Sequence, residues 1–85
     1  MKVYKIKEII NIILFIKDVK MTELADKCSF SYTALRNFLI YRTKMSFEHI
    51  EEIFKALDFP LFMALVISEK EYNRKELIEQ IIKLM

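Results

Sequence analysis

Apolar residues recur at helical spacing along nearly the whole chain, and this pattern predicts six helices. Positions i, i+3, i+4 and i+7 share one face of a helix, so apolar residues at those positions indicate a face turned toward a core. The predicted helices cover residues 5–18, 21–28, 32–40, 47–57, 61–68 and about 74–84. We therefore expect an all-α protein.

Polar residues mark where several of these helices begin and end. Ser31 and Ser46 are suitable N-caps, and residues 73–76 read as a capping box ahead of the last helix. Asp58 tolerates a left-handed backbone and is expected to end the fourth helix, while Pro60 suits the start of the fifth.

The width of each apolar face predicts how far each helix is buried. The fourth helix has one stripe, of Ile50, Ile53, Phe54 and Leu57, and an opposite wet face of Glu48, Glu51, Glu52 and Lys55. The fifth helix is apolar nearly all round, so we expect neighbours to cover most of it. The first is apolar over more than a stripe, and we expect it to be buried on two sides, one of them by the C-terminal helix or a partner chain.

The second and third helices form a pair with a short interruption at residues 29–31. The second helix turns Leu24, Ala25 and Cys28 toward the core; the third is expected to turn Ala34, Leu35 and Phe38 inward and Tyr32, Thr33, Arg36 and Asn37 elsewhere. A helix, a tight turn and a second helix with a polar exposed face are typical of a helix-turn-helix, here about 21–40.

These residues resemble the Cro/cI, or phage-repressor, type of helix-turn-helix domain. Glu23-Leu24-Ala25 matches the opening of the family pattern, Phe30-Ser31 its turn and Leu35 its buried aliphatic. Residues 45–57 match the stretch that closes the bundle, through Met45-Ser46-Phe47, Ile50, Ile53, Phe54 and Ala56-Leu57. The resemblance covers about half of the chain and implies a compact five-helix bundle over residues 1–68.

The chain departs from the family pattern at three places. Ser29 stands where the family favours a glycine in a left-handed backbone, which predicts local strain. Ile40-Tyr41 replaces an Asn-Gly pair, so we expect that loop to take another path. Lys20 and Met21 replace a threonine cap and a glutamine that contacts phosphate.

The resemblance implies a set of DNA contacts on the third helix and the loop after it. Tyr32, Thr33 and Asn37 would face base edges, and Arg36 would reach guanine or phosphate. Tyr32 and Asn37 could equally be plain surface. The whole candidate interface comprises Ser31, Tyr32, Thr33, Arg36, Asn37, Arg42, Thr43 and Lys44, the last three on phosphate.

The distribution of charge agrees with this assignment. The net charge is only +2, but residues 27–47 hold four basic residues and no acid, while residues 48–85 hold five basic residues and eight acids. A duplex backbone attracts such an acid-free patch, although a basic surface of this size is often only solvated.

Leu39 and Ile40 favour a different function. One of them should be core and the other exposed, and an exposed aliphatic residue suits a protein-binding surface better than a phosphate-binding one. The sequence therefore supports two functions. The first is a sequence-specific regulator of double-stranded DNA; the alternative is a protein-interaction module (antitoxin, antirepressor or assembly partner) that no longer binds DNA.

The last helix is an addition to a five-helix bundle, so residues 69–85 form a candidate dimerisation element. Its apolar face comprises Leu77, Ile78, Ile81, Ile82 and Met85. With the fifth helix it would form a homodimer that binds a palindromic operator with half-sites about one helical turn apart. The alternative is that it folds back across the first helix.

Composition excludes several other functions. The 85 residues suit one small domain, and with no glycine there is no phosphate loop. Cys28 is expected to be a small buried hydrophobe, and His49 has no second ligand at metal-binding spacing. We expect no enzyme, no cofactor and no metal.

The apolar run of the first helix is shorter than the roughly 20 residues of a membrane span, so we expect it to be a buried helix. A lone cysteine without a signal peptide favours the cytoplasm.

Overall fold

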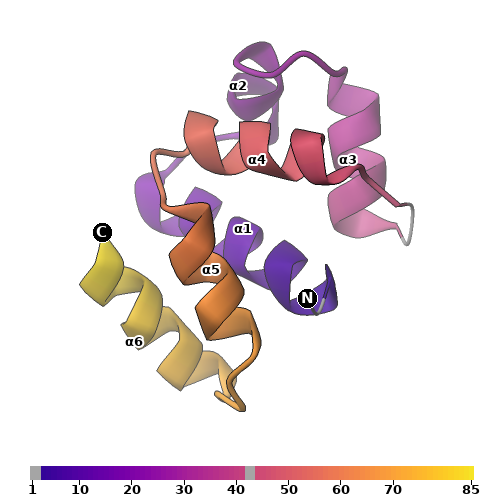
Figure 1. The fold of residues 1–85 in the computed structure, drawn as a ribbon. Coiled ribbons are helices and arrows are strands. Elements are labelled where there is room, and N and C mark those ends of the chain that lie inside the picture. Colours follow the sequence, from indigo (N-terminus) through magenta and orange to yellow (C-terminus); the bar gives the residue numbers. More distant parts are fainter. Residues whose placement is uncertain (1–2, 42–43) are drawn as a thin grey trace.

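The computed structural model describes residues 3–41 and 44–85, and within them it contains six helices and no strand (Figure 1). The helices are α1 (Val3–Lys17), α2 (Met21–Asp26), α3 (Tyr32–Ile40), α4 (Phe47–Ala56), α5 (Leu61–Ser68) and α6 (Arg74–Leu84). The predicted all-α class is confirmed, and every predicted helix is present with bounds shifted by two residues or fewer.

The predicted caps form the expected hydrogen bonds. The Ser31 Oγ accepts from the Ala34 backbone N–H at 3.1 Å, and the Ser46 Oγ accepts from the His49 N–H at 3.3 Å. At the start of α6, the Asn73 Oδ1 accepts from the Glu76 N–H, and the Glu76 Oε1 accepts from the Asn73 N–H, at 2.8 and 3.0 Å. Each cap satisfies backbone N–H groups that a helix start leaves without a partner.

Two aspartates, Asp18 and Asp58, have left-handed backbones, with φ of 53° and 54°. Each is followed by an apolar residue whose N–H bonds back five positions, Val19 to the Leu14 carbonyl and Phe59 to the Phe54 carbonyl. This is the helix-ending arrangement that a left-handed residue permits. The prediction for Asp58 is confirmed, and the same device at the end of α1 was not anticipated.

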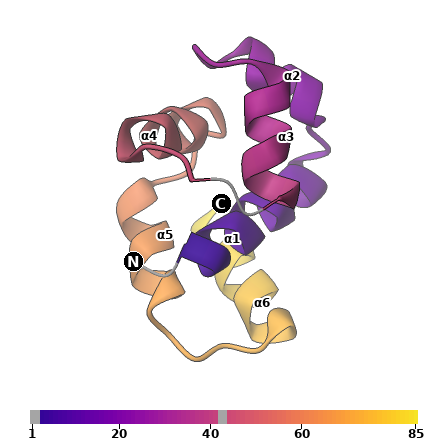
Figure 2. The ribbon, with the colours of Figure 1, turned by 90° about the vertical axis from the view of Figure 1, so that its right-hand side faces the viewer.

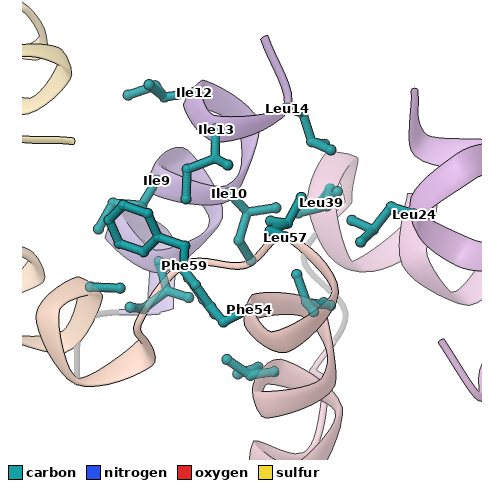
Figure 3. Close-up of a cluster of buried hydrophobic side chains, with 14 of the residues drawn as sticks. Ile9, Ile10, Ile12, Ile13, Leu14, Leu24, Leu39, Phe54, Leu57 and Phe59 are labelled. Atoms are coloured by element: carbon teal, nitrogen blue, oxygen red, sulfur yellow. The ribbon is translucent and has the colours of Figure 1, made fainter. Parts of the chain in front are cut away.

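Helix α1 is the centre of the molecule, with α2, α3 and α4 toward one end and α5 and α6 toward the other (Figures 1 and 2). It packs against α3, α5 and α6. Four of its isoleucines, Ile6, Ile9, Ile10 and Ile13, have no exposed surface. Figure 3 shows side chains of α1 meeting Leu39, Phe54, Leu57 and Phe59 in one cluster. The prediction that α1 is buried on two sides is confirmed, and the second cover is α6.

Helix α6 folds back onto α1 and α5. Leu77 and Ile81 are 2% and 0% exposed and belong to the common core, and the Arg74 guanidinium pairs with the Glu8 carboxylate of α1 at 3.3 Å. Leu77 and Ile81 were predicted to face a partner chain, but their side chains are covered within this chain. The stated alternative, that the last helix folds back across the first, is the one observed. Ile82 and Met85 remain exposed, at 55% and 47%.

Helix α5 is covered by its neighbours except along one stripe. It packs against α1, α4 and α6 and buries Ala64, Ile67 and Ser68, but Phe62 and Val66 are exposed. Most of α5 is therefore covered as expected, and the uncovered part is the stripe of Phe62 and Val66, which lie four residues apart on one face.

No helix in the described part of the chain is long and apolar enough to cross a membrane. The apolar run of α1 is instead the core of the bundle.

Candidate nucleic-acid interface

Helix α3 buries one face and exposes the other. Leu35, Phe38 and Leu39 are in the core, whereas Ile40 is 54% exposed, so the expectation of one buried and one exposed residue in that pair is confirmed. The expectation that Ala34 points inward was wrong: it is exposed and lines a groove that Ser46 and His49, at the start of α4, also line.

Five predicted DNA contacts lie on the outer side of α3 or at its start. Ser31, Tyr32, Thr33 and Arg36 are exposed, and Asn37 is half-buried. Arg36 and Asn37 lie three and four residues after Thr33, so the three side chains share one face of α3. Ile40 continues the same row. The row therefore offers a hydroxyl, a guanidinium and an amide, followed by one aliphatic side chain.

The C-terminal end of α3 is held by aromatic and backbone contacts. The Arg36 guanidinium lies 5.8 Å from the centre of the Tyr41 ring, a separation at which a cation is attracted to the ring face. The Tyr41 carbonyl accepts a hydrogen bond from the Lys7 Nζ of α1 at 3.3 Å. Lys7 also lies 4.9 Å from the Phe38 ring centre, so α1 fixes this end of α3.

The turn between α2 and α3 does not use the left-handed residue that the resemblance implied. Among the residues that the structure describes, only Asp18 and Asp58 have left-handed backbones, so the strain predicted at Ser29 is absent. Ser29 is bound to Glu52 of α4 instead. Its N–H donates to Glu52 Oε1 at 2.8 Å, and its Oγ donates to Oε2 at 2.7 Å.

This contact changes the assignment of Glu52, which was placed on a solvated face. The hydrogen bonds from the Ser29 side chain and backbone lower the pKa of the Glu52 carboxyl, since they stabilise its charged form. Beside it, the Phe30 and His49 rings lie 4.8 Å apart between centres. The only sequence signal for these contacts is that His49 and Glu52 lie three residues apart on one side of α4.

Cys28 lies just after α2. It packs against the core but is only half-buried, whereas the sequence predicted that it is buried. Burial and the negative charge of Glu52 raise the pKa of its thiol. The protonated thiol is therefore favoured at neutral pH, which fits an apolar packing role.

A groove of about 380 Å³ runs along the side of α3 toward the start of α4. It is lined by Phe30, Ala34, Asn37, Lys44, Met45, Ser46 and His49. Lys44, a predicted phosphate contact, thus lines the same groove as Asn37. Arg42 and Thr43 lie outside the described residues. Within those residues, no group of three His, Cys, Asp or Glu side chains could hold a metal ion.

Comparisons with models of protein families, with curated proteins and with solved structures find no match to this chain. The resemblance to Cro/cI domains therefore rests on the residues quoted for it.

Proposed function

We propose that the chain is a sequence-specific, double-stranded DNA-binding transcriptional regulator of repressor-like type. In this proposal α2 and α3 act as a helix-turn-helix, and the outer face of α3 enters the major groove. The observation that carries it is the row of Thr33, Arg36 and Asn37 on one face of α3, where Thr33 and Arg36 are exposed and Asn37 is half-buried. The row begins one residue after the capped start of α3. This row lies in the acid-free segment of the chain.

Each residue of the row has a distinct role. The Asn37 amide can pair with adenine, the Thr33 side chain offers a hydroxyl or a methyl contact, and Arg36 binds guanine or phosphate. Lys44, which lines the same groove as Asn37, contacts phosphate and fixes the register without reading the sequence. Ser31 and Tyr32 contact the backbone or base edges at the end of the helix that enters the groove first.

The salt dependence of duplex binding tests this proposal. Each neutralised phosphate gives a slope of about −0.9 in a plot of log affinity against log salt concentration. Lys44→Ala should reduce the slope by about 1, whereas Lys83→Ala, an equal change of charge on α6, should leave it unchanged. Anisotropy of a labelled duplex between about 50 and 200 mM salt measures both. A slope near zero, or one that Lys83→Ala alters as much as Lys44→Ala, would contradict the proposal.

We further propose that the regulator is a homodimer whose interface is the outer surface of α1 and α6. Phe15 is 87% exposed at the rim of a groove of about 330 Å³. The groove is lined by Ile12, Phe15, Ile16, Arg74, Ile78 and Ile82. Two copies related by a two-fold axis would cover this surface mutually, as symmetric dimers do.

Sedimentation at tens of micromolar tests the homodimer. Phe15→Ser should shift the protein toward monomer, whereas Tyr4→Ser, which changes another exposed aromatic residue of α1, should not. If the wild type is a monomer, the homodimer proposal fails, and DNA would be bound by one copy of α3 alone.

The alternative function is a protein-interaction module, and the observation that favours it lies beside α3. Ile40, Tyr41 and Tyr4 are all more than half exposed around a groove of about 410 Å³ between α1 and α3. An apolar partner would bind here with little dependence on salt. Ile40→Ala would then weaken partner binding more than Lys44→Ala, the reverse of the order expected for DNA.

A further inference from the structure

The turn that leads into α3 is held by a side chain from α4, 23 positions away. Both oxygens of the Glu52 carboxylate bind Ser29, one the backbone N–H and the other the side-chain hydroxyl, at 2.8 and 2.7 Å. A carboxylate that accepts two hydrogen bonds from one residue restricts the position and the orientation of that residue. We call this pair the Ser29–Glu52 clasp.

A second contact lies directly beside the clasp. Phe30 packs against His49, with the two rings tilted by 51°. His49 and Glu52 are three residues apart and so lie on the same side of α4. One side of α4 therefore holds two successive residues of the turn.

Only one residue separates these contacts from α3. Ser31 follows Phe30 and is the N-cap of α3. Its Oγ accepts a hydrogen bond from the Ala34 N–H, and its carbonyl accepts one from the Leu35 N–H. A displacement of Ser29 or Phe30 would therefore pass directly into the start of α3. The C-terminal end of α3 is held separately, by the hydrogen bond that the Lys7 Nζ donates to the Tyr41 carbonyl.

We propose that Glu52 is a positioning residue for α3: through Ser29 it sets the angle at which α3 presents the row of Thr33, Arg36 and Asn37. The clasp takes the place of the glycine turn of Cro/cI domains, which this chain lacks. The effect of Glu52 on DNA recognition rests on the proposed function, whereas its effect on the position of α3 is independent of that function.

Charge alone makes the opposite prediction for the same residue. A carboxylate near a DNA-binding surface repels phosphate, so its removal should strengthen duplex binding. If Glu52 positions α3, its removal should weaken binding to the preferred sequence even though a negative charge is lost. The two effects have opposite signs and can be separated.

Glu52→Gln and Glu52→Ala form a matched pair for this test. Both remove the charge, but glutamine keeps an oxygen that can accept from the Ser29 N–H and an amide that can donate to the Ser29 Oγ. Both residues are good helix formers, so α4 should persist in each variant. Ser29→Ala is the third variant, because it removes the hydroxyl but leaves the backbone donor.

We expect Glu52→Gln to bind the preferred duplex at least as tightly as the wild type. Glu52→Ala should bind it about tenfold more weakly, with non-specific binding unchanged or stronger, and Ser29→Ala should fall between the two. Equal affinity of the Gln and Ala variants for the preferred duplex would overturn the positioning role.

Amide hydrogen exchange of Ser29 and ¹⁵N relaxation of α3 provide a readout without DNA. Glu52→Ala should speed exchange at Ser29 and increase motion in residues 32–36, and Glu52→Gln should change neither. If the wild type binds no duplex, the proposed function fails and these measurements alone decide the positioning role. Unchanged exchange and relaxation in Glu52→Ala would overturn it.

Discussion

The exposed faces of α3 and of the α1–α6 pair are built from different chemistry, although one small bundle supports both. The α3 face presents a hydroxyl, a guanidinium and an amide at Thr33, Arg36 and Asn37. The α1–α6 face presents Phe15 and Ile82, which are 87% and 55% exposed. Polar groups can exchange water for bases and phosphates, whereas apolar side chains gain only by contact with another apolar surface.

The two faces also differ in how the fold holds them. The start of α3 is fixed by polar contacts, from the Ser31 cap and the Ser29–Glu52 clasp. The α1–α6 pair is fixed by apolar packing, through Leu77 and Ile81. Directional hydrogen bonds suit a surface that must meet a ligand at a defined angle, and packing suits one whose main requirement is burial.

The largest expected effect separates the two sides of α6. Ile81→Ala should lower the free energy of unfolding by about 2–5 kcal/mol, because it leaves a cavity beside α1. Ile82→Ala removes the same atoms from an exposed position and should change monomer stability by about 0.5 kcal/mol or less. Urea unfolding of both variants measures the difference, and equal losses would mean that α6 does not pack as described.

An intermediate effect is expected at the caps. Ser31→Ala and Ser46→Ala should each lower the free energy of unfolding by about 1 kcal/mol, because each leaves a helix N–H without its acceptor. Only Ser31→Ala should also weaken duplex binding, since Ser31 begins α3 and Ser46 begins α4. Thermal unfolding and duplex titration check this; equal losses of duplex affinity would place α3 outside the interface.

The smallest effect concerns the pKa of Cys28. Because the Glu52 charge raises the thiol pKa, Glu52→Gln should move the pH dependence of Cys28 alkylation toward lower pH. The shift should be partial, since burial is the larger cause and persists in the variant. An alkylation profile that does not move would show that the carboxylate does not act on the thiol.

Local signals made the helices predictable from the sequence. The serines at 31 and 46 and the Asn73 box act within a few residues, and each marked the start of its helix correctly. The helical spacing of isoleucines predicted the first helix, with bounds shifted by one or two residues. The polar row of α3 was predictable for the same reason, because its period is helical.

Long-range contacts were not predictable in this way. Glu52 follows the pattern of a solvated helix face, and nothing local indicates that Ser29 will meet it. The apolar face of α6 predicted burial correctly, but periodicity does not tell whether the cover is α1 or a second chain, and the structure divides the face between buried Leu77 and Ile81 and exposed Ile82. Ala34 was assigned inward from its spacing with Leu35 and Phe38, but alanine fits either side of a helix and its spacing alone does not decide.

Selection from a random-sequence duplex library at about 100 mM salt tests the central claim most directly. The comparison is between the wild type, the double variant Arg36→Ala with Asn37→Ala, and a control double variant Lys83→Ala with Gln80→Ala on α6. We expect the wild type and the control to enrich one sequence motif and the α3 variant to lose it. Folded wild-type protein that enriches no motif, or an α3 variant that enriches the same motif as the wild type, would contradict DNA recognition by α3.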